Sequence, residues 1–248
     1  MFDTLLLAAA AFCAGVLNTV AGGGTFLTFP ALVYTGVPVV AANATSAVAV
    51  FPGYLGGAAG FRAELAAYDR GRLLRILAAT AAGGLVGSLL LLVSSNEAFS
   101  VVVPFLLIAA TLAFAFGDRI QAWAQRRRLG RPEGWVGTVL VSVYGGYFNG
   151  GLGIVLLALF SLWGMRDLNV MNGLKNGLSF ILSAISVATF ALAGIVAWPQ
   201  AILMMVAATV GGYAGAPLAR MLPRKVVRGV VIAVGVAMSA VFLARLFV

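Results

Sequence analysis

The chain has 248 residues, of which 62% are apolar and 9% charged, and its formal net charge is +9. Its basic residues stand between apolar segments instead of alternating with aromatic residues on one face, so membrane topology explains them better than a nucleic-acid partner does. Cys13 is the only cysteine and histidine is absent, which excludes internal disulfides, paired-thiol chemistry and nearly every transition-metal site; we predict no metal and no cofactor.

Eight apolar segments follow one another, each bounded by charged residues, glycine or proline. They are residues 4–35, 39–60, 71–93, 98–117, 135–163, 169–193, 198–219 and 226–247. A bilayer core of about 30 Å requires about 20 helical residues, and lipid offers no partner to an unpaired backbone amide. We therefore predict an all-α integral membrane protein. The first apolar run has no basic residue before it and no polar cleavage region, so a membrane segment is favoured over a cleaved signal peptide.

Glycines interrupt two segments, 4–35 and 135–163, that are too long for one straight crossing. The interruptions are Gly22-Gly23-Gly24-Thr25 and Gly150-Gly151-Leu152-Gly153. Each should begin a second half-helix whose partially positive N-terminus points inward at mid-depth, where it would attract an anion. Glycines that serve only close packing are the alternative. A phosphate loop is disfavoured, because no Gly-Lys-Ser/Thr follows.

The two interrupted segments begin the two halves of an internal repeat. The recurring landmarks are Gly15-Val16-Leu17-Asn18 with Gly146-Tyr147-Phe148-Asn149, Asn43-Ala44-Thr45-Ser46 with Asn172-Gly173-Leu174-Lys175, and Thr80, Gly83 and Gly87 with Thr209, Gly211 and Gly215. Chance similarity between helices rich in alanine and glycine is the alternative. We predict a first membrane repeat at 1–117, a basic cytoplasmic linker at 118–134 and a second membrane repeat at 135–248.

Loop charge predicts the topology, because lysine and arginine in short loops mark the cytoplasmic side. The basic loops are 61–75, 118–134 and 220–228, whereas the loops around Gly36, Glu97 and Gly194 carry no lysine or arginine. All three basic loops share one side only if 135–163 enters and leaves on the same face, and by the repeat 4–35 should do likewise. We predict two inverted repeats, each a re-entrant broken hairpin plus three transmembrane helices, with both termini outside the cell inner membrane. Eight full crossings with one misplaced basic loop are the alternative.

Lys175 is the one charge well inside a predicted crossing, and Asn172, Asn176 and Ser179 flank it. An intramembrane charge costs at least about 2.5–3.5 kcal/mol on insertion scales, so we expect it to have a function. An unpaired ammonium facing a polar cavity attracts anions, and its compact charge suits a small oxyanion. A structural partner, or snorkelling to the cytoplasmic face, is the alternative.

The counterpart of Lys175 in the first half is Ser46, beside Asn43 and Thr45, so repeat symmetry should bring a cationic and a hydroxyl-rich face together. Hydrogen bonding between helices is the alternative role of these side chains. The acidic residues all lie at segment ends or in loops, so no buried carboxylate relay is predicted. The candidate substrate-binding residues are Asn18, Gly23, Gly24, Thr25, Asn43, Ser46, Asn149, Gly151, Asn172, Lys175 and Asn176.

The stretch 15–25, Gly15-Val16-Leu17-Asn18-Thr19-Val20-Ala21-Gly22-Gly23-Gly24-Thr25, and the stretch 43–46 resemble signatures of the sulfite exporter TauE/SafE family of membrane permeases. Residues 172–176, Asn172-Gly173-Leu174-Lys175-Asn176, are similar to the matching motif of the second half, so the resemblance covers nearly the whole chain. It implies transport of sulfite, sulfoacetate or related organic anions, often as export. Residues 150–153 depart from the triple-glycine pattern of the first half, so the two breaks need not contribute equally.

We predict a secondary transporter of small anions that works by alternating access at a midplane site. An anion channel and a non-transporting membrane subunit are the alternatives. A membrane enzyme is disfavoured, because the chain lacks histidine and paired intramembrane carboxylates. The expected partners are the small anion and the lipid bilayer, and Gly-xxx-Gly spacings permit a homodimer.

Overall fold

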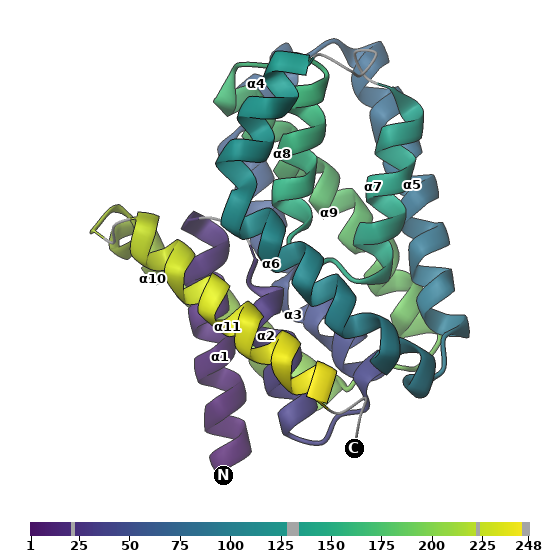
Figure 1. Cartoon of the computed structure of the whole chain (residues 1–248), viewed down its shortest axis with the longest axis vertical. Coiled ribbons are helices and arrows are strands. Elements are labelled where there is room, and N and C mark those ends of the chain that lie inside the picture. The colour runs from purple at the N-terminus through teal and green to yellow at the C-terminus, as the bar shows by residue number, and fades with distance from the viewer. Residues whose placement is uncertain (21–22, 128–133, 222–223, 245–248) are drawn as a thin grey trace.

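The computed structural model describes residues 1–20, 23–127, 134–221 and 224–244, and in these ranges the chain is helical, with no strand. Its helices are α1 (Phe2–Val20), α2 (Thr25–Tyr34), α3 (Val39–Gly60), α4 (Arg62–Ala67), α5 (Arg70–Val93), α6 (Asn96–Arg127), α7 (Trp135–Tyr147), α8 (Leu152–Leu162), α9 (Leu168–Leu192), α10 (Trp198–Met221) and α11 (Arg224–Ala244). The prediction of an all-α protein is confirmed. Figure 1 shows their arrangement.

Three helical stretches have the length and apolar composition of a membrane span, when only the described residues are considered. They are Arg70–Val93, Asn96–Ala113 and Leu168–Leu192. The outer faces of these helices are apolar: Leu85, Val86, Leu89 and Leu90 of α5 are all exposed. Exposed apolar faces of this extent are costly in water and favourable in lipid.

The helices differ from the predicted segments at two places near the basic loops. The short helix α4 lies within the predicted loop 61–75, and α6 continues past the predicted end at 117 to Arg127. Arginine, glutamine and alanine, which make up seven of the nine residues 119–127, are good helix formers, so the chain stays helical after its apolar stretch ends. The first half of the predicted linker 118–134 is therefore helix, and residues 128–133 lie outside the described residues.

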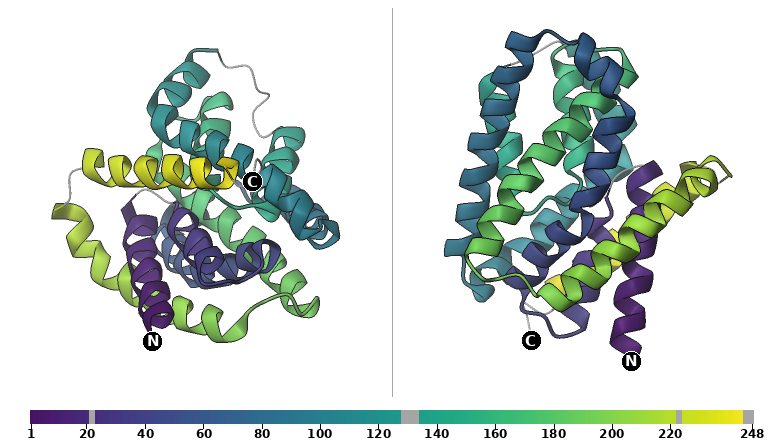
Figure 2. Two further views of the ribbon diagram at one scale, coloured as in Figure 1. Left: turned by 60° about the horizontal axis from the view of Figure 1, so that its bottom comes forward. Right: turned by 180° about the vertical axis from the view of Figure 1, so that it is seen from behind.

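Each glycine-interrupted segment folds as two antiparallel helices. Phe2 at the start of α1 and Tyr34 at the end of α2 line the same cavity. In the second hairpin, a Cβ added to Gly137 near the start of α7 would lie 2.9 Å from Leu159 Cδ1 near the end of α8. The hairpin α1–α2 enters the molecule from the end where the N-terminus lies, and α7–α8 enters from the opposite end (Figures 1 and 2).

Each hairpin packs against one long helix from the other half of the chain: α1 lies along α10, and α7 lies along α5. Both pairs approach closely at glycine. A Cβ added to Gly211 would overlap the backbone oxygen of Phe12, and one added to Gly87 would overlap that of Val143. Small residues at such positions allow two membrane helices to bring their backbones together.

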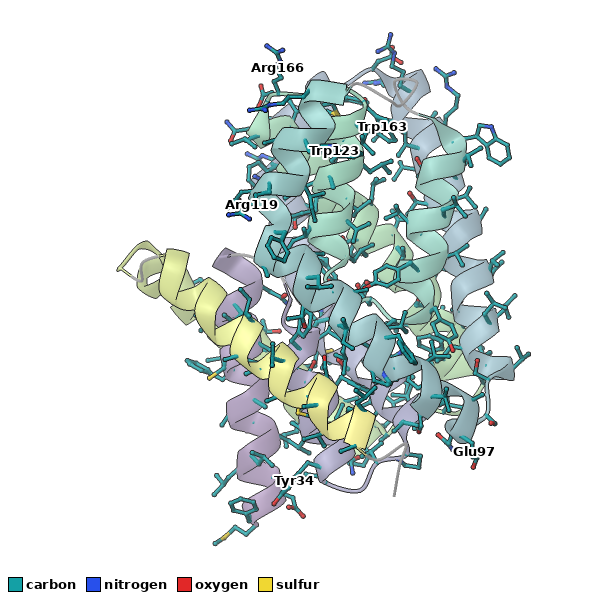
Figure 3. The ribbon with its side chains drawn as sticks, viewed as in Figure 1. Tyr34, Glu97, Arg119, Trp123, Trp163 and Arg166 are labelled. Atoms are coloured by element: carbon teal, nitrogen blue, oxygen red, sulfur yellow. The ribbon has the colours of Figure 1, made fainter. Side chains whose placement is uncertain are left out.

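The two ends of the molecule differ in charge. Arg166 and Glu97 lie at opposite ends in Figure 3, and the exposed Arg62 and Arg70 begin α4 and α5 at the Arg166 end. Trp163 also lies at that end, whereas Tyr34 lies at the other. The predicted basic positions Arg220, Arg224, Lys225 and Arg228 lie outside the side chains that the structure describes.

Candidate functional site

The second glycine break, between α7 and α8, is a tight reversal of the chain. Asn149 has a positive φ of 62°, and Gly151, which caps the N-terminus of α8, has a φ of 71°. This left-handed conformation is easiest for glycine and is tolerated by asparagine, which is why these residue types occupy the turn. Asn149 and Gly151 are both buried in the bundle.

Three side chains from two helices, α3 and α7, occupy hydrogen-bond acceptors of this break. Asn43 Nδ2 of α3 donates to the carbonyl oxygen of Tyr147 at 2.8 Å, and the Tyr144 hydroxyl of α7 donates to that of Gly150. The Tyr54 hydroxyl of α3 donates to Asn149 Oδ1 at 3.5 Å. Carbonyl groups released where a membrane helix ends must find partners, and here they find protein donors.

At the start of α8 the amides of Leu152, Ile154 and Val155 donate to backbone oxygens of the turn, and the amide of Gly153 is left open. Gly151 has no side chain with which to cap the helix, and the amide of Gly153 in the first turn donates to no other described residue. A helix N-terminus carries a partial positive charge of about half a unit, and its free amides point along the helix axis. The second break therefore presents one unused amide, that of Gly153, and positive potential inside the molecule.

Lys175 of α9 lies beside this helix start. A Cβ added to Gly153 would lie 3.3 Å from Lys175 Cδ, so the methylene chain of the half-buried lysine crosses the first turn of α8. Among the side chains that the structure describes, none forms an ion pair or hydrogen bond with Lys175. Asp167, the acidic residue closest in sequence, caps α9 instead and accepts hydrogen bonds from the amides of Asn169 and Val170 at 2.9 and 3.2 Å.

Asn172 and Asn176 accompany Lys175 on α9. Both are half-buried, and neither side chain hydrogen-bonds to another described residue. Together with Lys175 and the start of α8 they form a region rich in donors, which contains no described carboxylate that would neutralise it. We call this region, made of Gly151, Gly153, Asn172, Lys175 and Asn176, the α8–α9 site.

The first glycine break, between α1 and α2, satisfies its own groups. Asn18 Oδ1 accepts a hydrogen bond of 2.8 Å from the amide of Gly24, which caps α2. Gly23 has a φ of 97°, and Thr25 is buried in the first turn of α2. Gly22 lies outside the described residues.

Ser46 lies on the adjoining part of α3, where its Oγ is 2.6 Å from Thr28 Oγ1 of α2. This short bond joins the first hairpin to α3 and satisfies both buried hydroxyl groups. Asn43, three residues before Ser46 on α3, donates its hydrogen bond to the second break. Asn18, Thr28 and Ser46 at the first break are therefore paired within the protein.

A family model described as "Sulfite exporter TauE/SafE" matches residues 7–242. The chain belongs to this family. The resemblance carried by the sequence motifs is thus confirmed.

Relatives with the same description of function occur in several bacteria. A "Probable membrane transporter protein" of Haemophilus influenzae is 28% identical over 92% of this chain and 90% of its own length. "Probable membrane transporter protein ORF9" of Sinorhizobium sp. is 28% identical over 95% and 90%, and "Probable membrane transporter protein YfcA" of Escherichia coli K12 is 28% identical over 93% and 86%. No solved structure matches the chain. The protein is a multi-pass membrane transporter of the TauE/SafE type.

The expected pocket shared by Ser46 and Lys175 is not what this TauE/SafE protein shows. The rings of Phe51 and Phe180 stack where α3 crosses α9, with centroids 5.2 Å apart, and the two helices run in opposite directions (Figure 2). Ser46 and Lys175 each precede their phenylalanine by five residues, so each lies about 7.5 Å along its axis on opposite sides of the crossing. Because the two helices are antiparallel, five residues toward the N-terminus lead to opposite ends of the molecule on α3 and α9, so Ser46 and Lys175 lie apart.

Several residues that build the two breaks were not among the sequence candidates. Tyr54, Tyr144 and Thr28 hold backbone or side-chain groups of the breaks, but a single hydroxyl in an apolar segment carries no signal of its partner. Ser183 and Ser186 did carry a signal, because with Lys175 and Ser179 they recur at helical spacing.

Proposed function

We propose that this TauE/SafE protein is a secondary transporter of small oxyanions such as sulfite or a small sulfonate, and that the α8–α9 site binds the anion. One observation carries the proposal: unpaired Lys175 crosses the uncapped first turn of α8. Two positive features placed together inside a membrane protein repel one another unless an anion or water lies between them.

The hydrogen-bonding groups of the second break favour an anion over a cation. A cation would need free oxygen ligands, but the carbonyl oxygens of Tyr147 and Gly150 already accept hydrogen bonds. The unused groups include the Lys175 ammonium, which repels a cation, and the amide of Gly153, which can only donate. The side chains of Asn172 and Asn176 can turn their NH2 groups toward an anion. Ionised acceptors form the strongest hydrogen bonds with such donors.

A sulfur oxyanion suits this set of donors. Sulfite and sulfonate groups carry three oxygens around one atom, so one group can accept from an ammonium, an amide of α8 and a side-chain amide at once. Lysine offers three donors on a compact charge, without the planar geometry that selects carboxylate. The family description names sulfite, which supports this choice of substrate.

We further propose that the chain is two inverted repeats, 1–117 and 135–248, with a two-fold axis between Phe51 and Phe180. These rings are separated in sequence by the same interval as Asn43 and Asn172, and residues related by a two-fold axis touch one another only on that axis. The packing of α1 on α10 and of α7 on α5 supports the same relation.

The glycine contacts support another register for the proposed repeat. The sequence comparison paired Gly83 with Gly211, but Gly87 meets the Val143 oxygen as Gly211 meets the Phe12 oxygen. Phe12 lies three residues before Gly15, and Val143 lies three residues before Gly146. Gly15 and Gly146 begin the matching landmarks of the two halves. Gly87 is thus the counterpart of Gly211, one helical turn from the sequence pairing, because glycine-rich helices match in several registers.

The membrane arrangement that follows has two re-entrant hairpins from opposite faces, α1–α2 and α7–α8. The end that carries Arg62, Arg70 and Arg166 would face the cytoplasm, since positive residues favour that side of an inner membrane. The start of α1 would then lie outside. Rocking of the two repeats around the fixed site would expose it alternately to either side.

Purified protein in liposomes tests the proposed substrate and site together. Flux of sulfite, methanesulfonate and a potassium control would be measured for the wild type, Lys175→Gln and Lys175→Arg. Arg166→Gln is the matched control, because it removes one positive charge at the exposed end of the molecule. We expect saturable anion flux that falls at least tenfold in Lys175→Gln, is partly kept in Lys175→Arg and is unchanged in Arg166→Gln.

Three results would contradict the proposal. Equal flux in the wild type and Lys175→Gln would remove Lys175 from the pathway. Potassium flux comparable with anion flux would overturn anion selectivity. No flux of either anion under a pH gradient or a voltage would exclude this substrate class.

A further inference from the structure

A polar face runs along α9 beyond the proposed anion site. Lys175, Ser179, Ser183 and Ser186 are spaced by four, four and three residues, which places them on one side of the helix. The three serines are 2%, 0% and 2% exposed. The face is therefore buried within the bundle and does not meet lipid.

Two of these serines lack hydrogen bonds. Ser183 Oγ and Ser186 Oγ are buried and have no partner among the described atoms. Thr189 on the same helix behaves differently, because its hydroxyl donates to the Ile185 oxygen at 2.8 Å, as helical hydroxyls commonly do. Hydroxyl groups that are buried and unpaired inside a protein indicate a place where water or a polar ligand completes the hydrogen bonding.

The neighbours of α9 define where this polar face points. Leu182, on one side of the face, packs against Gly84 of α5 and Gly145 of α7. Phe180, on its other side, stacks on Phe51 of α3. The serines thus face the part of the bundle that lies between α3 and the pair α5–α7.

The polar face passes the level at which α3 and α9 cross. With a rise of about 1.5 Å per residue, Ser179 lies on the Lys175 side of Phe180, whereas Ser183 and Ser186 lie on the Ser46 side. The face therefore connects the level of the α8–α9 site with the level of the first hairpin.

We propose that Ser179, Ser183 and Ser186 line the passage by which the anion, with part of its water, moves between the α8–α9 site and the end of the molecule where α9 ends. This rests on the proposed function. Serine hydroxyls donate and accept, so they can replace water around an oxyanion. The serines carry no charge that would hold the anion in place. A passage must bind the anion weakly enough for it to leave again, and uncharged hydroxyl groups meet this requirement.

Cysteine accessibility tests the passage directly, because Cys13 is the only cysteine of the chain and is exposed. In a Cys13→Ser background, Ser183→Cys and Ser186→Cys would be compared with Leu182→Cys, whose position is equally buried on the adjoining face. The probes are a small methanethiosulfonate reagent that bears a sulfonate and its trimethylammonium analogue.

We expect the sulfonate reagent to modify Ser183→Cys and Ser186→Cys at least tenfold faster than Leu182→Cys, and methanesulfonate to slow the reaction. Equal rates at all three positions, or faster reaction with the trimethylammonium reagent, would overturn the passage. Flux in the same background separates the two proposals: Lys175-dependent flux without labelling would refute the passage alone. Labelling without Lys175-dependent flux would refute the anion site and leave the passage.

Discussion

The two glycine breaks have similar architecture and opposite chemistry. In the first, the Asn18 side chain occupies the amide of Gly24 at the start of α2. In the second, Asn43 and Tyr144 occupy carbonyl oxygens at the end of α7 and in the turn, and the start of α8 stays uncapped. The first break has its Gly24 amide paired with a side chain, whereas the second keeps the Gly153 amide free beside the ammonium group of Lys175.

The difference teaches what a break in a membrane helix contributes by itself. Glycine lets the chain turn at depth and releases both amide and carbonyl groups, which lipid cannot satisfy. The neighbouring side chains then decide which of the two kinds of group remains. The side chains that face the breaks differ in the same sense: Ser46 pairs with Thr28, whereas Lys175 crosses Gly153 and remains unpaired among the described side chains.

The largest expected effect tests whether the two hairpins are equivalent in packing. Gly87→Ala and Gly211→Ala each place a Cβ on a backbone oxygen, of Val143 and Phe12 respectively, and backbone cannot move aside as a flexible side chain does. We expect each to lose about 3 kcal/mol of unfolding free energy or more, since overpacking of this kind separates two helices. Thermal unfolding in detergent measures it.

Gly53→Ala is the matched control, because a Cβ there meets no atom within 4 Å. It should unfold at the wild-type temperature. Loss of stability in Gly87→Ala but not in Gly211→Ala would show that the two helix pairs are not equivalent, and the inverted repeat would lose its main packing support.

The positions of most helices could be predicted from the sequence, because an apolar run and a glycine interruption each determine structure within a few neighbouring residues. Helix α1 ends before the triple glycine and α2 begins after it, and α7 and α8 separate at residues 148–151, as the interruptions predict. The end of α6 was misplaced, because a basic stretch of helix formers ends the apolar pattern without ending the helix. Under the proposed repeat, the register between distant glycines also differs from the sequence pairing, because packing between helices selects it.

The candidate site could be predicted only in part, because its contacts also depend on packing between distant helices. Lys175 stood out as a charge in an apolar segment, and Asn18 and Asn149 stood out beside the glycines. The sequence did not contain the direction in which α3 and α9 cross, so it could not separate Ser46 from Lys175. Nor did it indicate that Tyr54 and Tyr144 hold the second break, because their partners depend on tertiary packing.

The second prediction fills the α8–α9 site with a side chain, so that this break no longer has a free helix start beside Lys175. Gly153→Leu places a side chain where the methylenes of Lys175 now lie, within 3.3 Å of the new Cβ. We expect at least a tenfold fall in methanesulfonate flux with a folded protein, because the ammonium is displaced from the start of α8. Gly229→Leu is the control, since a Cβ there meets no atom within 4 Å. Normal flux in Gly153→Leu would separate Lys175 from the start of α8 in function.

The third prediction compares a lost donor with a lost acceptor. Asn43→Ala leaves the Tyr147 carbonyl unpaired and should cost about 1–3 kcal/mol of stability, the usual penalty for a buried unsatisfied group. Asn18→Ala removes the cap of α2 and should cost about 0.5–2 kcal/mol. Thermal unfolding of both variants measures the difference. A neutral Asn43→Ala would mean that water replaces the amide, and that the second break is hydrated on its carbonyl side as well.

The smallest expected effect concerns the hydroxyl pair of Thr28 and Ser46. A double-mutant cycle of Thr28→Ala and Ser46→Ala should give a coupling of about 0.6 kcal/mol, the average for hydrogen bonds between membrane helices. Flux should stay near the wild-type value in both single variants, because this pair joins α2 to α3 and leaves the α8–α9 site untouched. A flux loss as large as that of Lys175→Gln would place the hydroxyl pair in the binding site. The two breaks would then act as one site across the α3–α9 crossing, and the contrast between the two breaks would fail.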